Sequence, residues 1–328
     1  MLCISNNNVS LNNITCLDKT ERYTKIIDNM GFLNKEEVLK DDVVIYNKEY
    51  KYKEKLVGNR NKCYNVIEEE NFYTNTQASS KRKITYVTDL STGRVIGRKL
   101  ESPQDDLSNV SYEYSPYGFL VCELDELRHF KTVYSYDNNG NITRIEKFNT
   151  NTNESISVKT FNYDTLWPDR LKEIVDNGVM YMLEYDESLY GMPVKLYKYI
   201  NNEYVVYHTL EWFRSDLTKY TLDSSKYLEY KYDANGLRIE KKLTNNQAGG
   251  YIKHNYRYSQ GKLIEDYIED EIKGEYSKIK FLYDEVGLLY GFEYDNEVYY
   301  YLRDALQTII GIINENKEIV CEYEYDAW

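Results

Sequence analysis

The sequence predicts an all-β protein: a curled or spiral antiparallel ribbon of stacked β-hairpins, with little helix. Three observations support this fold class. An aromatic motif recurs through most of the chain, helical periodicity is weak throughout, and tyrosine dominates the hydrophobic residues, with 37 Tyr among 328 residues against 9 Phe and 3 Trp. A chain with 15% aromatic residues and only 4 Pro has the composition of a folded protein. Its mean hydropathy of −0.68 argues against a large apolar core and favours thin sheets whose faces carry amphipathic rings.

The recurring unit is aromatic-x-Tyr-Asp-x-x-Gly, and its fullest copies are residues 134–140 and 230–236. Aromatic residues at i and i+2 share one face of a strand. The Asp carboxylate can accept backbone N–H bonds two residues on, and Gly supplies a positive φ. A second short strand follows the Gly, so each unit is predicted to be a β-hairpin. The repeat positions are Tyr112, Tyr114, Gly118, Tyr134, Tyr136, Asp137, Gly140, Tyr163, Asp164, Tyr185, Asp186, Tyr230, Tyr232, Asp233, Gly236, Tyr256, Tyr258, Gly261, Tyr283, Asp284, Gly287, Tyr325 and Asp326.

The second aromatic of the unit recurs in steps of 22 to 27 residues, with one longer step of 47 that has Trp212 near its middle. A period in this range predicts a repeat architecture. One hairpin cannot bury its own face, so successive hairpins are expected to join a continuous sheet. We expect their Tyr rings to stack as cross-strand neighbours, each pair contributing about 0.2–1 kcal/mol.

The first part of the chain lacks clear copies of the motif. Residues 1–80 are predicted to be a degenerate β lead-in, and residues 81–328 to be the repeat-bearing segment. Strands are still predicted at 42–46 and 84–88, because both segments are rich in β-branched and aromatic residues. The second of these strands is expected to end in a turn at residues 90–93.

Charge and composition exclude several classes of protein. The 41 Lys and Arg against 54 Asp and Glu give a net charge of −13, which disfavours a nucleic-acid partner. No apolar run approaches the ~18 residues of a membrane span. The first ten residues lack the basic flank and apolar stretch of a signal peptide. The 5 Cys are widely spread, so neither a disulfide framework nor a zinc site is predicted.

No constellation of residues predicts catalysis, a cofactor or a metal site. His129, His208 and His254 are far apart and lack a metal-binding spacing. Acidic pairs are so numerous that we expect them on the solvated surface rather than in a glycosidase cleft. Residues 137–141 place oxygens as calcium loops do, but the closing acidic residue is missing, and a turn is expected. Trp212 is the candidate carbohydrate contact, because aromatic faces can stack on sugar rings.

The motif at this spacing resembles the YD repeat of RHS and wall-associated proteins, the shells of bacterial polymorphic toxins. The resemblance covers residues 112–328 well and is closest over about 281–328, which is similar to the start of the RHS-associated core. Gln307 stands where the family usually has Gly, and the chain stops at Trp328 in mid-motif. The segments that carry the core resemblance are residues 281–287, 299–304, 309–314 and 320–328.

The resemblance implies a spiral β-sheet that closes into a hollow shell around a toxic C-terminal domain, which many members free by aspartyl self-cleavage downstream. We therefore expect a non-catalytic shell segment that encapsulates and delivers a C-terminal toxin domain absent from this chain. The full-length protein would be secreted or at the cell surface and would act in competition between bacteria. Cut at Trp328, the ribbon is expected to expose strand edges and to self-associate.

The alternative is a cell-surface module that binds wall carbohydrate through exposed aromatic residues. It predicts saturable binding to peptidoglycan or teichoic-acid preparations, and the substitution Trp212→Ala should abolish that binding. Retention on no wall fraction would contradict it. An enzyme ranks behind both hypotheses, and a turnover abolished by one carboxylate substitution would be needed to support it.

Overall fold

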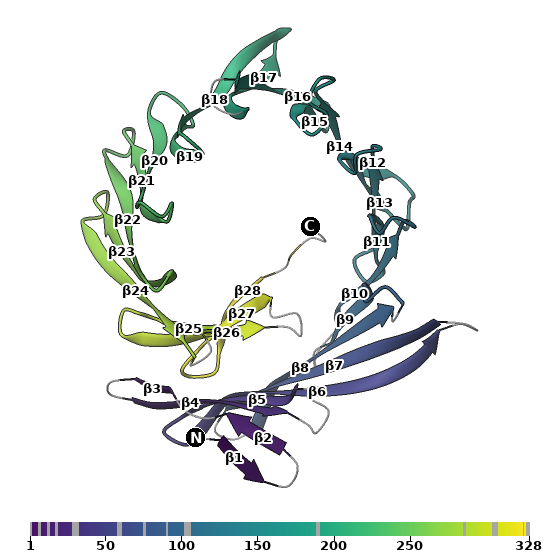
Figure 1. Cartoon of the computed structure of the whole chain (residues 1–328), viewed down its shortest axis with the longest axis vertical. Helices are drawn as coiled ribbons and strands as arrows, with labels where there is room; N and C mark the ends of the chain where they lie inside the picture. Colours follow the sequence, from purple (N-terminus) through teal and green to yellow (C-terminus); the bar gives the residue numbers. More distant parts are fainter. Residues whose placement is uncertain are drawn as a thin grey trace. The chain divides into compact units, whose positions relative to one another are not determined.

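The computed structural model describes residues 2–5, 8–11, 14–16, 19–27, 33–57, 61–74, 77–89, 91–101, 106–187, 191–284, 287–303, 308–323 and 325. The elements formed by these residues are all β-strands, and they pair antiparallel with their neighbours along the chain (Figure 1). The predicted all-β ribbon of antiparallel hairpins is therefore confirmed. Within these residues, no helix is long and apolar enough to cross a membrane.

The chain divides into two compact units. Unit 1 comprises Met1–Lys131, Leu282–Phe292 and Glu297–Trp328, and unit 2 comprises Thr132–Phe281 and Glu293–Asn296. Unit 1 is thus assembled from the two ends of the chain, and unit 2 from its middle. The two units are defined by contacts between residues and not by where the sequence motif begins. The boundary expected near residue 80, between the lead-in and the repeat-bearing segment, therefore stays a prediction.

Unit 1 contains paired strands from both ends of the chain. Its strands β4 to β11 pair in sequence order, and β26 pairs with β27 and β27 with β28. The strands are β1 (Leu2–Ser5), β2 (Asn8–Leu11), β3 (Ile14–Cys16), β4 (Lys19–Ile27), β5 (Leu33–Lys40), β6 (Val43–Val57), β7 (Asn61–Thr74), β8 (Gln77–Asp89), β9 (Val95–Glu101), β10 (Asp106–Tyr114), β11 (Leu120–Asp125), β25 (Leu289–Tyr294), which continues into unit 2, β26 (Glu297–Arg303), β27 (Ile309–Asn314) and β28 (Ile319–Glu322).

A dry core holds unit 1 together. Along β26 every second residue is buried, and its Tyr300 and Leu302 pack with Ile313 of β27. Val38 and Ile45, from β5 and β6, belong to the same cluster. Burying side chains of this size contributes about 1.5–3 kcal/mol each. The core therefore joins strands that are more than two hundred residues apart in the sequence.

Unit 2 is an ordered row of hairpins. Each strand from β13 to β23 pairs antiparallel with the next strand along the chain (Figure 1). The strands are β12 (Phe130–Tyr136), which begins in unit 1, β13 (Ile142–Asn149), β14 (Ser155–Tyr163), β15 (Leu171–Asp176), β16 (Val179–Asp186), β17 (Met192–Ile200), β18 (Glu203–Phe213), β19 (Asp216–Thr221), β20 (Lys226–Tyr232), β21 (Arg238–Asn245), β22 (Gly250–Ser259), β23 (Lys262–Asp270) and β24 (Glu275–Tyr283), which ends in unit 1.

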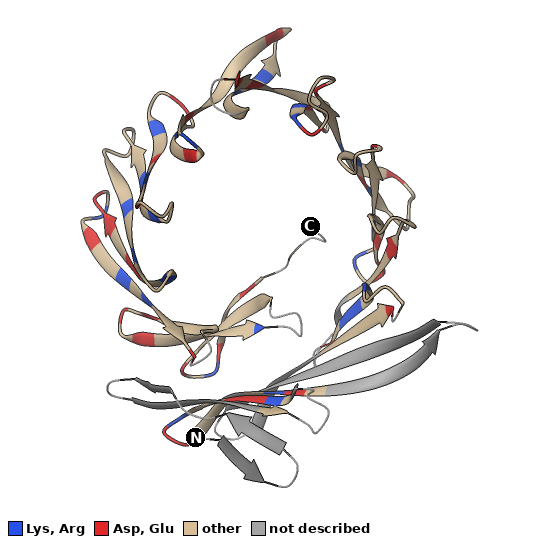
Figure 2. Cartoon of the chain, viewed as in Figure 1, with Lys and Arg blue, Asp and Glu red and all other residues tan. Residues whose placement is uncertain are grey.

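Unit 2 has almost no dry interior. Among its described residues only Tyr134, Thr244 and Asp266 are buried, and the others are half-buried or exposed. Acidic and basic residues recur along its strands (Figure 2). Cross-strand ion pairs such as Lys253–Glu269 at 2.5 Å link neighbouring strands, and each such pair is worth roughly 0.2–1 kcal/mol. Unit 2 is a single-layer sheet, so a hydrophobic core cannot be what holds it together.

The turn chemistry predicted for the repeat is confirmed. Asp137 Oδ1 accepts hydrogen bonds from the backbone N–H groups of Asn139 and Asn141, each at 2.9 Å, and Gly140 has a φ of 90°. These bonds hold the pKa of Asp137 below its ordinary value, with the Asn141 side chain as the largest cause. In the less complete copy, a hydrogen bond from Arg170 lowers the pKa of Asp164 to about 2. The carboxylate therefore stays ionised and keeps accepting turn bonds.

We predict that Gly236→Val destabilises the chain. Gly236 has a φ of 78° and open space around its Cα, so the cost comes from backbone strain rather than from a clash. A β-branched side chain in this region costs about 1–3 kcal/mol in the free energy of unfolding. The matched control is Gly236→Asn, because Asn tolerates positive φ and should lose much less. Equal thermal midpoints for Gly236→Val and the parent chain would contradict the turn assignment.

Candidate functional site

The second tyrosine of the repeat lies at a β-bulge. The register between the two strands of each hairpin shifts immediately before Tyr114, Tyr163, Tyr185, Tyr232 and Tyr258. A bulge increases the local twist and changes the direction of the side chain that follows it. The motif therefore places its second aromatic residue directly after a β-bulge, near the end of the first strand of the hairpin.

From the bulge, each of these hydroxyl groups reaches back to the hairpin before it. Tyr163 Oη donates a hydrogen bond of 2.9 Å to the carbonyl oxygen of Ile142, and Tyr258 Oη donates one of 2.9 Å to that of Arg238. Arg238 is the residue paired with Tyr232, so the acceptor belongs to the previous bulge. We call this arrangement the hairpin junction. The same kind of bond, from a tyrosine hydroxyl to a backbone carbonyl oxygen, joins Tyr114 to Val95, Tyr185 to Leu171, Tyr232 to Leu217 and Tyr325 to Ile309.

Two residues that are not tyrosine make the same junction. Trp212 follows a bulge, and its indole Nε1 donates a hydrogen bond of 2.7 Å to the carbonyl oxygen of Pro193, the residue paired with Tyr185. Arg303 also follows a bulge, and its Nη2 donates a hydrogen bond of 2.7 Å to Leu289 O. Trp212 divides the long step of 47 residues into steps of 27 and 20, which are close to the period of 22 to 27 residues.

The sequence had marked Trp212 as the candidate carbohydrate contact. The structure places this residue half-buried in the junction with its indole N–H already bonded to the protein. Sequence reasoning missed Arg303, because it is not aromatic. Its only signal is its spacing, 20 residues after Tyr283 and 22 before Tyr325.

Arginine side chains cover several of the junction rings. The guanidinium of Arg94 lies 5.6 Å from the ring centroid of Tyr114, that of Arg170 lies 5.2 Å from Tyr185, and that of Arg238 lies 5.5 Å from Tyr232. Cation–π contacts at exposed sites are worth about 0.5–1 kcal/mol. For these three rings, the packing expected between successive tyrosines is supplied by arginine instead.

Three of the junction hydroxyls have a pKa above the ordinary value for tyrosine. Burial raises the pKa of Tyr163, Tyr185 and Tyr258, so their hydroxyl groups stay protonated at neutral pH. A neutral phenol can donate its proton to a carbonyl oxygen, whereas a phenolate can only accept. At these three positions the side chain is therefore a lasting hydrogen-bond donor.

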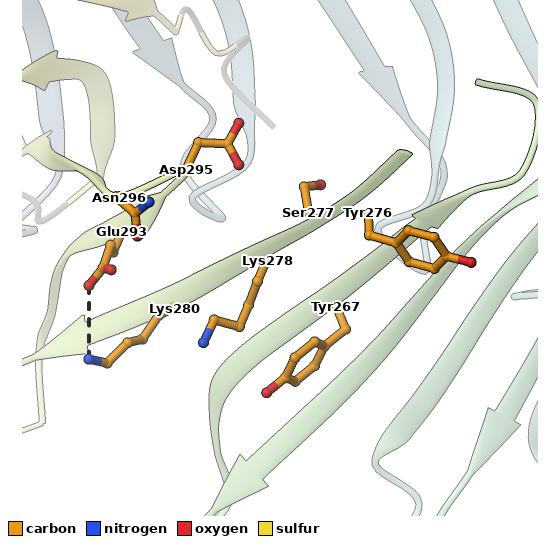
Figure 3. Close-up of a pocket in the computed structure, with 8 residues that line it drawn as sticks. All are labelled: Tyr267, Tyr276, Ser277, Lys278, Lys280, Glu293, Asp295 and Asn296. Carbon is orange, nitrogen blue, oxygen red and sulfur yellow. Dashed lines mark ion pairs between the residues drawn. The ribbon is translucent and has the colours of Figure 1, made fainter. Parts of the chain in front are cut away.

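A shallow groove of about 300 Å³ lies on β23, β24 and the β25–β26 turn (Figure 3). The Lys278 ammonium lies 5.8 Å from the ring centroid of Tyr267, and Lys280 pairs with Glu293 at 3.9 Å. Tyr276 is 79% exposed beside them. The carboxylates balance the lysines, so the groove offers aromatic faces and mixed hydrogen-bonding groups rather than a positive field. The groove is lined by Tyr267, Tyr276, Ser277, Lys278, Lys280, Glu293, Asp295 and Asn296.

The histidines and cysteines do not come together. His254 Nδ1 lies 2.8 Å from the buried Asp266 carboxylate, His208 Nδ1 lies 3.3 Å from Leu222 O, and His129 lies in the β11–β12 turn. Within the described ranges, no three His, Cys, Asp or Glu side chains are placed to hold a metal ion. Cys122 and Cys321 are free thiols. The sequence-predicted positions Gln307, Asp326 and Trp328, and the side chains of Cys3, Cys16 and Cys63, lie outside the described residues.

Comparisons with known proteins give only distant likenesses. No protein-family model and no curated protein matches the sequence. Similar solved structures include a Tc holotoxin pore of Photorhabdus luminescens with a substituted TccC3, at 10% identity and a TM-score of 0.38 over 94% of this chain and 24% of that chain. The TcdB2–TccC3–Cdc42 structure is 11% identical, with a TM-score of 0.39 over 97% of this chain and 23% of that chain. This chain thus spans about a quarter of their length, and TM-scores this low do not establish a shared fold.

We predict that Tyr163→Phe weakens the sheet. The substitution keeps the ring and removes the hydroxyl that bonds Ile142 O at 2.9 Å, so the expected loss is about 1 kcal/mol in the free energy of unfolding, measured by urea titration. The control is Tyr276→Phe, whose ring is 79% exposed and which should change stability by less than about 0.5 kcal/mol. Equal effects of the two substitutions would show that the junction contributes nothing.

Proposed function

We propose that this chain is a non-catalytic wall segment of an RHS-type shell, which encloses and delivers a toxin domain that follows it in the full-length protein. The observation that carries the proposal is the hairpin junction. It recurs from Tyr114 to Tyr325, and at each of the places described above it connects a hairpin to the one before it. The motif that forms the junction is the same motif that resembles the YD repeat.

The way in which the junction stabilises the sheet is suited to the wall of a shell. Each junction involves only two neighbouring hairpins, so a sheet built this way can be lengthened one hairpin at a time without a growing core. The three buried side chains of unit 2 show that the sheet needs no second layer. A single layer separates two aqueous spaces, and its half-exposed polar faces would tolerate an unfolded or loosely held cargo.

The identity of the cargo rests on the resemblance alone. RHS-type shells carry the toxin C-terminal to the core, and residues 281–328 are similar to the start of that core. The proposal therefore places a toxin domain after residue 328, in a protein that is secreted or displayed on the cell and used in competition between bacteria.

The test uses the polypeptide that the complete gene encodes. A recognition sequence for a site-specific protease is placed in the region after residue 328, and cleavage is followed under native conditions. We expect the site to be spared in the full-length protein, to be cut when the region is expressed alone, and to become accessible when the wall unfolds. A stop codon directly after codon 328, or equal cleavage in both proteins, would overturn the proposal.

A further inference from the structure

The hairpin of β17 and β18 extends beyond the strands on either side of it (Figure 1). On one side, the pairing of β16 with β17 ends at Tyr181 opposite Lys198. On the other side, the pairing of β18 with β19 begins only at Thr209 opposite Thr221. The described strands therefore leave residues 203–208 of β18 with an edge that no neighbouring strand covers.

This edge is apolar and exposed. Tyr204, Val205, Val206 and Tyr207 are 38%, 45%, 52% and 42% exposed, and they follow one another directly. Natural edge strands are commonly protected by Lys, Pro or a covering loop, because an unprotected edge is a template for another strand. Residues 203–207 contain neither Lys nor Pro, and their only charge is Glu203. The edge is therefore suited to pair with a strand from another chain.

The turn determines which backbone groups face outward. Asn201 and Asn202, with φ of 50° and 67°, form a two-residue turn closed by Ile200 opposite Glu203. The residues that flank such a turn exchange both hydrogen bonds, and the pattern then alternates along the strand as far as Val206, after which the register with β17 shifts by one residue at Tyr207. The N–H and C=O groups of Val205 thus point to β17, whereas those of Tyr204 and Val206 point to the free edge.

We propose that this edge pairs with the same edge of a second copy of the chain, antiparallel and about a two-fold axis at Val205. In that register Tyr204 exchanges two backbone hydrogen bonds with the partner's Val206, and symmetry repeats them, so all outward groups of the stretch are satisfied. The two Val205 side chains face each other as a non-hydrogen-bonded pair. A surface that is complementary to itself in this way is what a closed dimer requires.

Charge complementarity selects a second copy over an unrelated strand. Glu203 and Val205 lie on one face of β18, and Lys198, opposite Val205, shares that face. Tyr207 follows the register shift, and its ring lies on the same face, 6.0 Å from the ring of Tyr181, the residue paired with Lys198. The Lys198 ammonium lies 5.4 Å from the Tyr207 ring centroid. In the proposed register Glu203 lies opposite the partner's Tyr207, within reach of the Lys198 that covers that ring. The interface therefore contains two symmetric Glu–Lys pairs that an unrelated edge would lack.

The first test is sedimentation of the full chain over a range of concentrations. We expect a monomer–dimer equilibrium, and Val205→Lys should weaken dimerisation by about tenfold or more, because it sets two ammonium groups face to face. Val205→Thr keeps the β-branched shape and should leave the dimer intact. Ile156→Lys makes the same charge change at a residue that is 49% exposed on β14, and should also have no effect.

The second test is of the register. Val205→Cys places two thiols in a directly opposed pair, whose Cα separation of about 4.5 Å permits a disulfide. Mild oxidation should convert this variant into a covalent dimer, above the background from the native cysteines in the parent chain. In Val206→Cys the thiols are diagonal neighbours about 7–8 Å apart and should crosslink poorly. A parent chain that remains monomeric, a dimer insensitive to Val205→Lys, or equal crosslinking of both cysteine variants would overturn the proposal.

Discussion

The hydrogen bond from a bulge side chain to the backbone of the preceding hairpin is the interaction on which the architecture of unit 2 depends. A single-layer sheet cannot gain much from apolar burial, and isolated two-stranded hairpins are marginal at best in water. The junction adds a net contribution of about 1 kcal/mol per bond. Each donor side chain lies at a bulge of its own hairpin and bonds a backbone carbonyl oxygen of the hairpin before it. Stability in such an array is a sum of small neighbour terms rather than the property of one core.

Unit 1, in contrast, is stabilised by a buried hydrophobic core. The alternating burial along β26 and the core shared by Val38, Ile45 and Ile313 are features of a packed domain. An ion pair between Lys40 and Glu315 joins the same two parts of the chain. One chain therefore combines a packed unit, formed from its ends, with an open sheet formed from its middle.

The sequence was sufficient for the features whose chemistry is local. The Asp137 and Gly140 turn could be predicted because a carboxylate acceptor and a positive φ are requirements of a few adjacent residues. The bulge before Tyr163 could not be predicted, because a regular strand and a bulged strand place the same residues in the same order. Arg303 was missed because the junction needs a donor at that position rather than an aromatic ring. The core of unit 1 was not visible, because no local pattern connects Val38 with Ile313.

The central claim is that the junctions make the hairpins of unit 2 one cooperative sheet. Residue-resolved amide hydrogen exchange of the native chain tests this claim most directly, because it reports the free energy of opening at each strand. We expect the central strands β14 to β22 to exchange with one shared opening free energy, since breaking one junction weakens both neighbouring hairpins. Separate opening free energies for each hairpin, unrelated to those of its neighbours, would contradict it.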